Sequence, residues 1–219
     1  MEPLQQTLLG GGEPRIDERA VFERVDLDDL SWVEMARGWL EGADTLLDAL
    51  ASSVPWTQGR RWMYERMVDD PRVSAWYRAG DELPHPVLDD VRRTLSRHYG
   101  VPLRAVGLNY YRDGRDSVAW HSDRELKYLD RTLIAIVTLG GPRPFLVRPK
   151  GGGHSHDFRP GSGDLLVMRG RCQADWEHSV PKVRSAPPRM SVSLRWASHE
   201  GLPTDHPRAR RSRRVSVDR

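Results

Sequence analysis

Residues 189–196 read RMSVSLRW, and this stretch decides the fold of the second half of the chain. Polar and apolar residues alternate along it: Arg189, Ser191, Ser193 and Arg195 are polar, and Met190, Val192, Leu194 and Trp196 are apolar. Successive side chains of a β-strand point to opposite faces, so one face of this strand is polar and the other is apolar. The apolar face predicts contact with a core. The two arginines predict either a buried anion between them or an ordinary exposed polar face.

Four runs upstream of this stretch have the same character. They are rich in branched and aromatic residues and are separated by Gly, Pro and Asp: RAVGLNYYR at 104–112, TLIAIVTLG at 132–140, PFLVR at 144–148 and DLLVM at 164–168. Short runs of this kind, bounded by turn residues, predict strands. The C-terminal half is therefore predicted to be a sandwich or jelly roll.

The first half of the chain shows helical periodicity instead. Residues 86–99 begin with a proline, end before Gly100 and carry one apolar stripe, made of Val87, Leu88, Val91, Leu95 and Tyr99. Residues 43–53 carry three leucines at helical spacing and are closed by Pro55. Helices followed by many short strands predict an α+β fold, with N-terminal helices packed on a jelly-roll core.

The length of 219 residues suffices for one domain with its own core. We predict a loosely ordered segment over 1–20, one folded domain over 21–200 and a basic, disordered tail over 201–219. The single cysteine, Cys172, excludes an internal disulfide and a Cys-rich zinc site. A lone thiol without a signal peptide predicts a cytoplasmic protein, and no apolar run approaches the length of a membrane span. Nothing in the sequence requires more than a monomer.

Charge is distributed unevenly along the chain. Residues 1–50 hold 4 basic and 12 acidic residues, whereas residues 51–200 hold 24 basic and 17 acidic ones. Arginine accounts for 31 of the 34 basic residues. A basic body is compatible with a polyanionic ligand, and arginine suits planar recognition of phosphate or carboxylate, although genomic base composition also favours arginine.

A candidate metal site begins at Trp120-His121-Ser122-Asp123. In a strand, His121 and Asp123 would share one face. A distant second histidine would complete the two-histidine, one-carboxylate arrangement that binds Fe(II) and leaves positions open for a co-substrate and dioxygen. His178 is well placed for this, because it follows a predicted strand and precedes Pro181. An ordinary surface polar pair is the alternative interpretation of His121 and Asp123.

The predicted strand over 104–112 offers two further polar groups. Asn109 and Tyr111 share one face of it and could donate hydrogen bonds to a carboxylate inside the barrel. Ordinary strand polarity is the alternative.

These stretches together resemble the AlkB-type iron(II)- and 2-oxoglutarate-dependent dioxygenases. NYYRDGRDSVAWHSDRE at 109–125 is similar to the family's Asn-x-Tyr … His-x-Asp segment, QADWEHSVPK at 173–182 to its second histidine motif, and 189–195 to its Arg-x-Asn-x-Thr-x-Arg motif. PRVSAWY at 71–77 is similar to the substrate-lid region of members that repair nucleic acid. The chain departs from the pattern at Ser191 and Ser193, where the family usually has Asn and Thr, and at Arg124, where close relatives often carry an acid.

The resemblance implies a double-stranded β-helix core and a dioxygenase domain over 21–200. It implies Fe(II), 2-oxoglutarate and O2, with no catalytic residue beyond the metal ligands His121, Asp123 and His178. The residues that it implies for 2-oxoglutarate are Asn109, Tyr111, Arg189, Ser193 and Arg195.

The resemblance also implies a substrate, alkylated DNA. The reaction would demethylate 1-methyladenine and 3-methylcytosine and release formaldehyde, succinate and CO2, with the base flipped out or single-stranded. Trp76 and Tyr77 are predicted to stack on the base, Glu125 to contact its edge and Arg72 to contact phosphate. The alternatives are core packing for Trp76 and Tyr77, a salt bridge for Glu125 and a solvated surface position for Arg72. Further candidates for phosphate contact are Arg112, Arg115 and Arg143. RNA, a protein side chain or a small molecule as substrate, or an inactive nucleic-acid-binding module, are the alternative functions.

Overall fold

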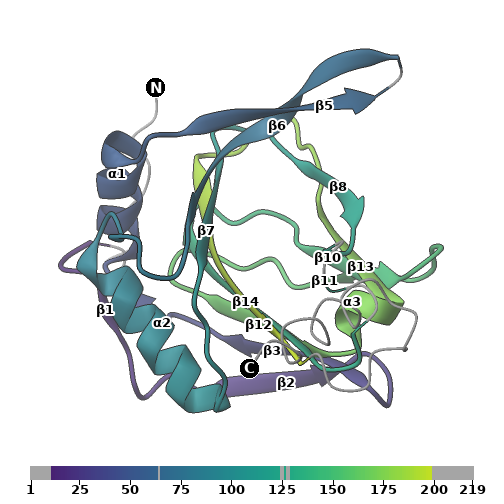
Figure 1. The fold of residues 1–219 in the computed structure, drawn as a ribbon, viewed down its shortest axis with the longest axis horizontal. Coiled ribbons are helices and arrows are strands. Elements are labelled where there is room, and N and C mark those ends of the chain that lie inside the picture. The colour runs from purple at the N-terminus through teal and green to yellow at the C-terminus, as the bar shows by residue number, and fades with distance from the viewer. Residues whose placement is uncertain (1–10, 64, 124–125, 127–128, 199–219) are drawn as a thin grey trace, which may run out of the picture.

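The computed structural model describes residues 11–63, 65–123, 126 and 129–198. Two antiparallel sheets carry the fold (Figure 1). The large sheet contains, in spatial order, β2 (Phe22–Asp26), β3 (Ser31–Ala36), β12 (Leu165–Gly170), β9 (Thr132–Gly140), β14 (Arg189–Ala197), β7 (Val106–Tyr111), β6 (Arg66–Tyr77) and β5 (Thr57–Met63). The small sheet contains β11 (His156–Asp157), β10 (Leu146–Pro149), β13 (Trp176–Val180) and β8 (Val118–His121).

Two helices cover the outer face of the large sheet (Figure 1). They are α1 (Ala43–Ser53) and α2 (Pro86–Tyr99), and both match the ranges predicted from the sequence. Their buried leucines pack with the outward-facing side chains of β7, β9, β12 and β14, including Leu108, Val137, Leu165 and Val192. The helix α2 ends where Gly100 adopts φ 65°, a left-handed conformation that glycine takes without steric cost.

A second core lies on the inner face of the large sheet. Tyr111, Ile134, Ile136, Leu166 and Met168 from that sheet pack with Phe145, Val147, Trp176 and Val180 of the opposing segment. A short helix, α3 (Cys172–Asp175), leads into β13. The α+β class with a jelly-roll core and packed helices is therefore confirmed.

The alternation at 189–196 has the predicted consequence. Met190, Val192 and Leu194 of β14 are at most 1% exposed and belong to the outer core. The polar face is buried as well, since Arg189 is 0% and Ser193 is 3% exposed. An ordinary exposed face is thereby excluded for these residues.

The N-terminal half contains more strand than the sequence analysis predicted. β2 and β3 extend the large sheet beside β12, and β5 and β6 form a hairpin that reaches across the top of Figure 1. The expected loose order of 1–20 does not apply to β1 (Arg15–Ile16), which pairs with β4 (Leu40–Glu41). Residues 1–10 and the tail over 201–219 lie outside the described residues, and the division into three segments stays a prediction.

Helices in the described part of the chain are all too short or too polar to cross a membrane.

Candidate metal and 2-oxoglutarate site

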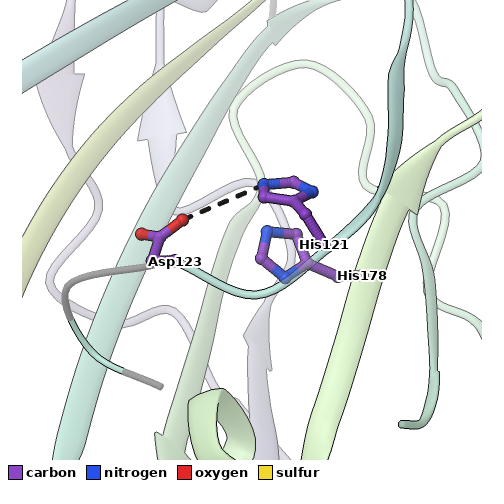
Figure 2. Close-up of side chains that lie close together, drawn as sticks. All are labelled: His121, Asp123 and His178. Carbon is purple, nitrogen blue, oxygen red and sulfur yellow. Dashed lines mark ion pairs between the residues drawn. The ribbon is translucent and has the colours of Figure 1, made fainter. Parts of the chain in front are cut away.

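Two strands of the small sheet bring the predicted metal ligands together. His121, the last residue of β8, is paired across the ladder with His178 of β13, and the two ring centroids are 4.2 Å apart. Asp123 lies just beyond the end of β8, with its Oδ1 3.9 Å from Nε2 of His121. One potential ligand atom from each residue lies within 4.8 Å of the others, and Figure 2 shows the three side chains converging. A group of two imidazoles and one carboxylate fits Fe(II).

Both imidazoles are held in the state that a metal requires. Nδ1 of His121 donates to the carbonyl oxygen of Ala119 at 2.9 Å, so Nε2 is the unprotonated nitrogen and faces Asp123. Burial lowers the pKa of His121. Burial, together with the neighbouring His121, lowers the pKa of His178 to about 3. Neutral imidazoles are metal ligands without first losing a proton.

Two neighbouring side chains form hydrogen bonds with Asp123. Nε of Arg195 donates to Oδ2, and Oε1 of Gln173 accepts the Asp123 backbone N–H at 2.8 Å. Burial alone would raise the pKa of Asp123, but the charge and the hydrogen bond of Arg195 outweigh it and hold the pKa below its usual value. The oxygen Oδ1 stays directed toward His121.

Arg189 has the features of an anion receptor. Its side chain is fully buried, and burial lowers its pKa to about 10. Two of its nitrogens donate to hydroxyl groups, of Ser191 at 2.8 Å and of Thr138 at 3.2 Å. Among the described residues no acceptor reaches Nε, and no carboxylate pairs with the guanidinium. A buried cation with an unused donor fits the distal carboxylate of 2-oxoglutarate.

Strand register places the remaining predicted 2-oxoglutarate residues beside Arg189. β14 pairs with β7 so that Arg189 lies opposite Tyr111 and Ser191 opposite Asn109. The guanidinium carbon of Arg189 lies 5.3 Å from the centre of the Tyr111 ring. Ser193 Oγ donates to the carbonyl of Gly107 and accepts from Arg195, so this hydroxyl holds Arg195 in place.

Arg72, which was predicted to contact phosphate, lies next to this group. Its Nε donates to Oδ1 of Asn109 at 3.0 Å, and its buried NH1 has no acceptor among the described residues. This contact forms because β6 lies next to β7, and the phosphate role of Arg72 stays a prediction. With Oδ1 occupied, the Asn109 amide is oriented to donate through its NH2 group.

The two predicted stacking residues, Trp76 and Tyr77, have different surroundings. Trp76 is 56% exposed and lies 4.9 Å from the Arg195 guanidinium, at the rim of the site. Tyr77 is partly buried and packs against the outer core, which favours the core-packing alternative for this residue. Neighbouring residues on a strand point to opposite faces, and only one of the two can face the site. Glu125 and Arg124 lie outside the described residues.

The other phosphate candidates are engaged within the protein. Arg143 is 1% exposed and donates to the carbonyls of Asp113, Asp116 and Pro181. Arg112 pairs with Asp116, and Arg115 pairs with Asp113. Arg143 is therefore structural.

Three residues that contribute to the site were not predicted from the sequence. Gln173 lay inside a quoted motif without a role, and Thr138 was hidden in an apolar run. Gly107 was signalled by a glycine inside a strand pattern, which often marks a close approach. A Cβ there would lie 2.8 Å from the Trp76 ring.

Comparisons with known proteins agree with this site. The sequence model of the 2OG-Fe(II) oxygenase superfamily matches residues 49–217. The human protein named alpha-ketoglutarate-dependent dioxygenase alkB homolog 3 is 31% identical over 219 residues, which cover 87% of this chain and 76% of the relative. An Arabidopsis thaliana protein named DNA oxidative demethylase ALKBH2 is 28% identical over 194 residues, covering 69% and 61%.

Two solved structures share the fold. A prolyl hydroxylase from Trichoplax adhaerens superposes with a TM-score of 0.58 at 12% identity, covering 75% of this chain and 83% of that one. The structure of OsALKBH1 gives a TM-score of 0.51 at 13% identity, covering 79% and 99%. The chain thus belongs to the 2OG-Fe(II) oxygenase superfamily, as an AlkB-like iron(II)- and 2-oxoglutarate-dependent dioxygenase.

Proposed function

We propose that this dioxygenase removes methyl groups from ring nitrogens of DNA bases, with 1-methyladenine and 3-methylcytosine as substrates. The reaction converts 2-oxoglutarate and O2 to succinate and CO2, and the methyl group leaves as formaldehyde. The observation that carries the proposal is the convergence of His121, Asp123 and His178, together with the buried guanidinium of Arg189, whose Nε has no acceptor among the described residues.

The positions of these residues indicate which of them would bind iron and which would bind 2-oxoglutarate. His121, Asp123 and His178 would hold the iron, which when bound supplies the activation of dioxygen and the oxidation of the methyl group. Arg189 would bind the distal carboxylate of 2-oxoglutarate through Nε. Tyr111 lines this end, and the Asn109 amide, oriented by Arg72, is positioned to donate to the keto-acid end.

An aromatic side chain at the rim of the site is suited to recognise the proposed substrate. Trp76 offers an exposed aromatic face beside Arg195. Both proposed lesions are cationic, and aromatic faces attract cations as well as stacking on bases. Flipping a base out of a duplex costs about a few kcal/mol, and less when the base is damaged. The Arabidopsis relative named a DNA oxidative demethylase supports the same substrate class.

Mass spectrometry of oligonucleotides tests the proposal. DNA and RNA strands containing 1-methyladenine or 3-methylcytosine are incubated with the protein, ferrous ion, ascorbate and 2-oxoglutarate. Loss of the mass of one CH2 unit from DNA, as N–CH3 becomes N–H, with stoichiometric formaldehyde, is expected, and His178→Ala is the inactive control. Succinate formation with every oligonucleotide unchanged would reject nucleic acid as the substrate, and demethylation of RNA alone would reject DNA.

A further inference from the structure

Gln173 connects the second histidine segment to the metal-binding carboxylate. It lies in α3, shortly before His178, and its side chain is 0% exposed. Its Oε1 accepts the backbone N–H of Asp123 at 2.8 Å. Because an N–H can only donate, the amide oxygen must face Asp123, and Nε2 then faces the weakly accepting Sδ of Met168 at 4.0 Å. The strong side-chain hydrogen bond of this buried amide goes to Asp123.

The backbone of Gln173 is fixed without any help from Asp123. Nζ of Lys150 donates to the Gln173 carbonyl at 3.0 Å. Arg171 clamps the same helix through an ion pair with Asp175, at 2.6 Å between Nε and Oδ2. The Gln173 amide therefore extends from an independently anchored helix.

Asp123 needs such an anchor because the sheet does not hold it. The β8–β13 ladder positions both imidazoles, but β8 ends at His121. The Asp123 carbonyl accepts the Leu126 N–H at 2.9 Å. Two further bonds come from side chains: Arg195 donates to Oδ2, and Gln173 accepts the backbone N–H. These two bonds together determine where Oδ1 points.

We propose that Gln173 is a positioning residue: its amide fixes the Asp123 backbone so that Oδ1 faces His121 and His178. This inference rests on the proposed metal ligand set. Outer partners of metal ligands are worth about 10–100-fold in metal affinity, which gives the expected size of the effect. A residue that merely packs α3 would change the stability of the protein but not its affinity for metal.

The test measures Mn(II) binding to the metal-free protein, from the loss of the electron paramagnetic resonance signal of free Mn(II). Gln173→Met keeps the length of the side chain and removes the acceptor. Cys172→Ala is the matched control, because Cys172 is an equally buried neighbour in α3 whose Sγ contacts only the Trp32 carbonyl among the hydrogen bonds described. We expect Gln173→Met to weaken Mn(II) binding about tenfold, with Cys172→Ala unchanged and His178→Ala without binding.

Equal affinity of Gln173→Met and wild type overturns the proposal, as does an equal loss in both α3 variants. Wild-type protein that binds no Mn(II), or binds it as well as His178→Ala, overturns the ligand set itself. If Gln173→Met does not fold, hydrogen exchange in the wild type decides. The Asp123 amide is expected to be protected in metal-free protein, and exchange at the rate of an unprotected peptide overturns the proposal.

Discussion

Arg189 carries a fully buried guanidinium whose pKa burial lowers to about 10, with no carboxylate partner among the described residues. A buried charge without a counterion costs folding stability, and a bound 2-oxoglutarate would offset that cost. We expect Arg189→Met to raise the KM for 2-oxoglutarate about thirtyfold, from the loss of about 2 kcal/mol of charged hydrogen bonding. In the absence of 2-oxoglutarate, its free energy of unfolding should be unchanged or higher.

Succinate formation at varied 2-oxoglutarate measures the first effect, and denaturant unfolding measures the second. A variant with unchanged KM and several kcal/mol less stability would show that Arg189 is purely structural.

Arg72 could orient Asn109 for 2-oxoglutarate or contact phosphate, and a substitution distinguishes these two roles. Its Nε donates to Asn109, so Arg72→Met should raise the KM for 2-oxoglutarate several-fold. A phosphate contact would instead reduce the slope of log affinity against log salt for oligonucleotide binding by about 1. We expect that slope to stay unchanged. A smaller slope with an unchanged KM would show that Arg72 contacts phosphate and does not orient Asn109 for 2-oxoglutarate.

Within β7, Gly107 lies between side chains of the two neighbouring strands, Trp76 of β6 and Ser193 of β14. A Cβ at Gly107 would lie 2.8 Å from two ring carbons of Trp76 and 2.9 Å from Ser193 Oγ. Gly107→Ala should therefore cost about 1–3 kcal/mol of stability through overpacking. In a Trp76→Ala background the same change should cost less, and a double-mutant cycle from chemical unfolding measures the difference. Strict additivity would contradict the contact.

In α3, the thiol of Cys172 is 1% exposed, and burial raises its pKa to about 12. The thiolate is the reactive form, so at pH 8.5 the native protein should resist iodoacetamide. Mass spectrometry should find Cys172 unmodified in native protein and alkylated in denaturant. Rapid alkylation of the native protein would show that α3 opens.

Elements with a continuous local pattern were predictable from the sequence. β9 and α2 match their predicted ranges because an apolar run and a capped apolar stripe need no information from the rest of the chain. β6 carries Asp69-Asp70-Pro71 within it, a sequence that argues against a strand. It forms at the edge region of the sheet, paired with β5 and β7, and only tertiary pairing explains it. β3 alternates buried and half-buried residues, so its signal was present and overlooked.

At the scale of the whole molecule, the site could be predicted only in part. The ligand set followed from the resemblance, and the structure brings those three residues together. The partners of Arg72 and Gln173 depend on which strands and helices become neighbours, which one sequence does not state. Trp76 and Tyr77 were given the same role because their strand was not recognised, and neighbouring residues of a strand point to opposite faces.

One iron centre, built by His121, Asp123 and His178, is expected to receive 2-oxoglutarate from the side of Arg189. Addition of 2-oxoglutarate to the Fe(II)-loaded protein without oxygen tests it most directly, because a keto acid that chelates Fe(II) produces a visible charge-transfer absorption. We predict this absorption in the wild type, its absence in His178→Ala, and its appearance only at higher 2-oxoglutarate concentration in Arg189→Met. Absorption in His178→Ala equal to that of the wild type, at the same concentrations, would show that His178 is not a ligand of the iron.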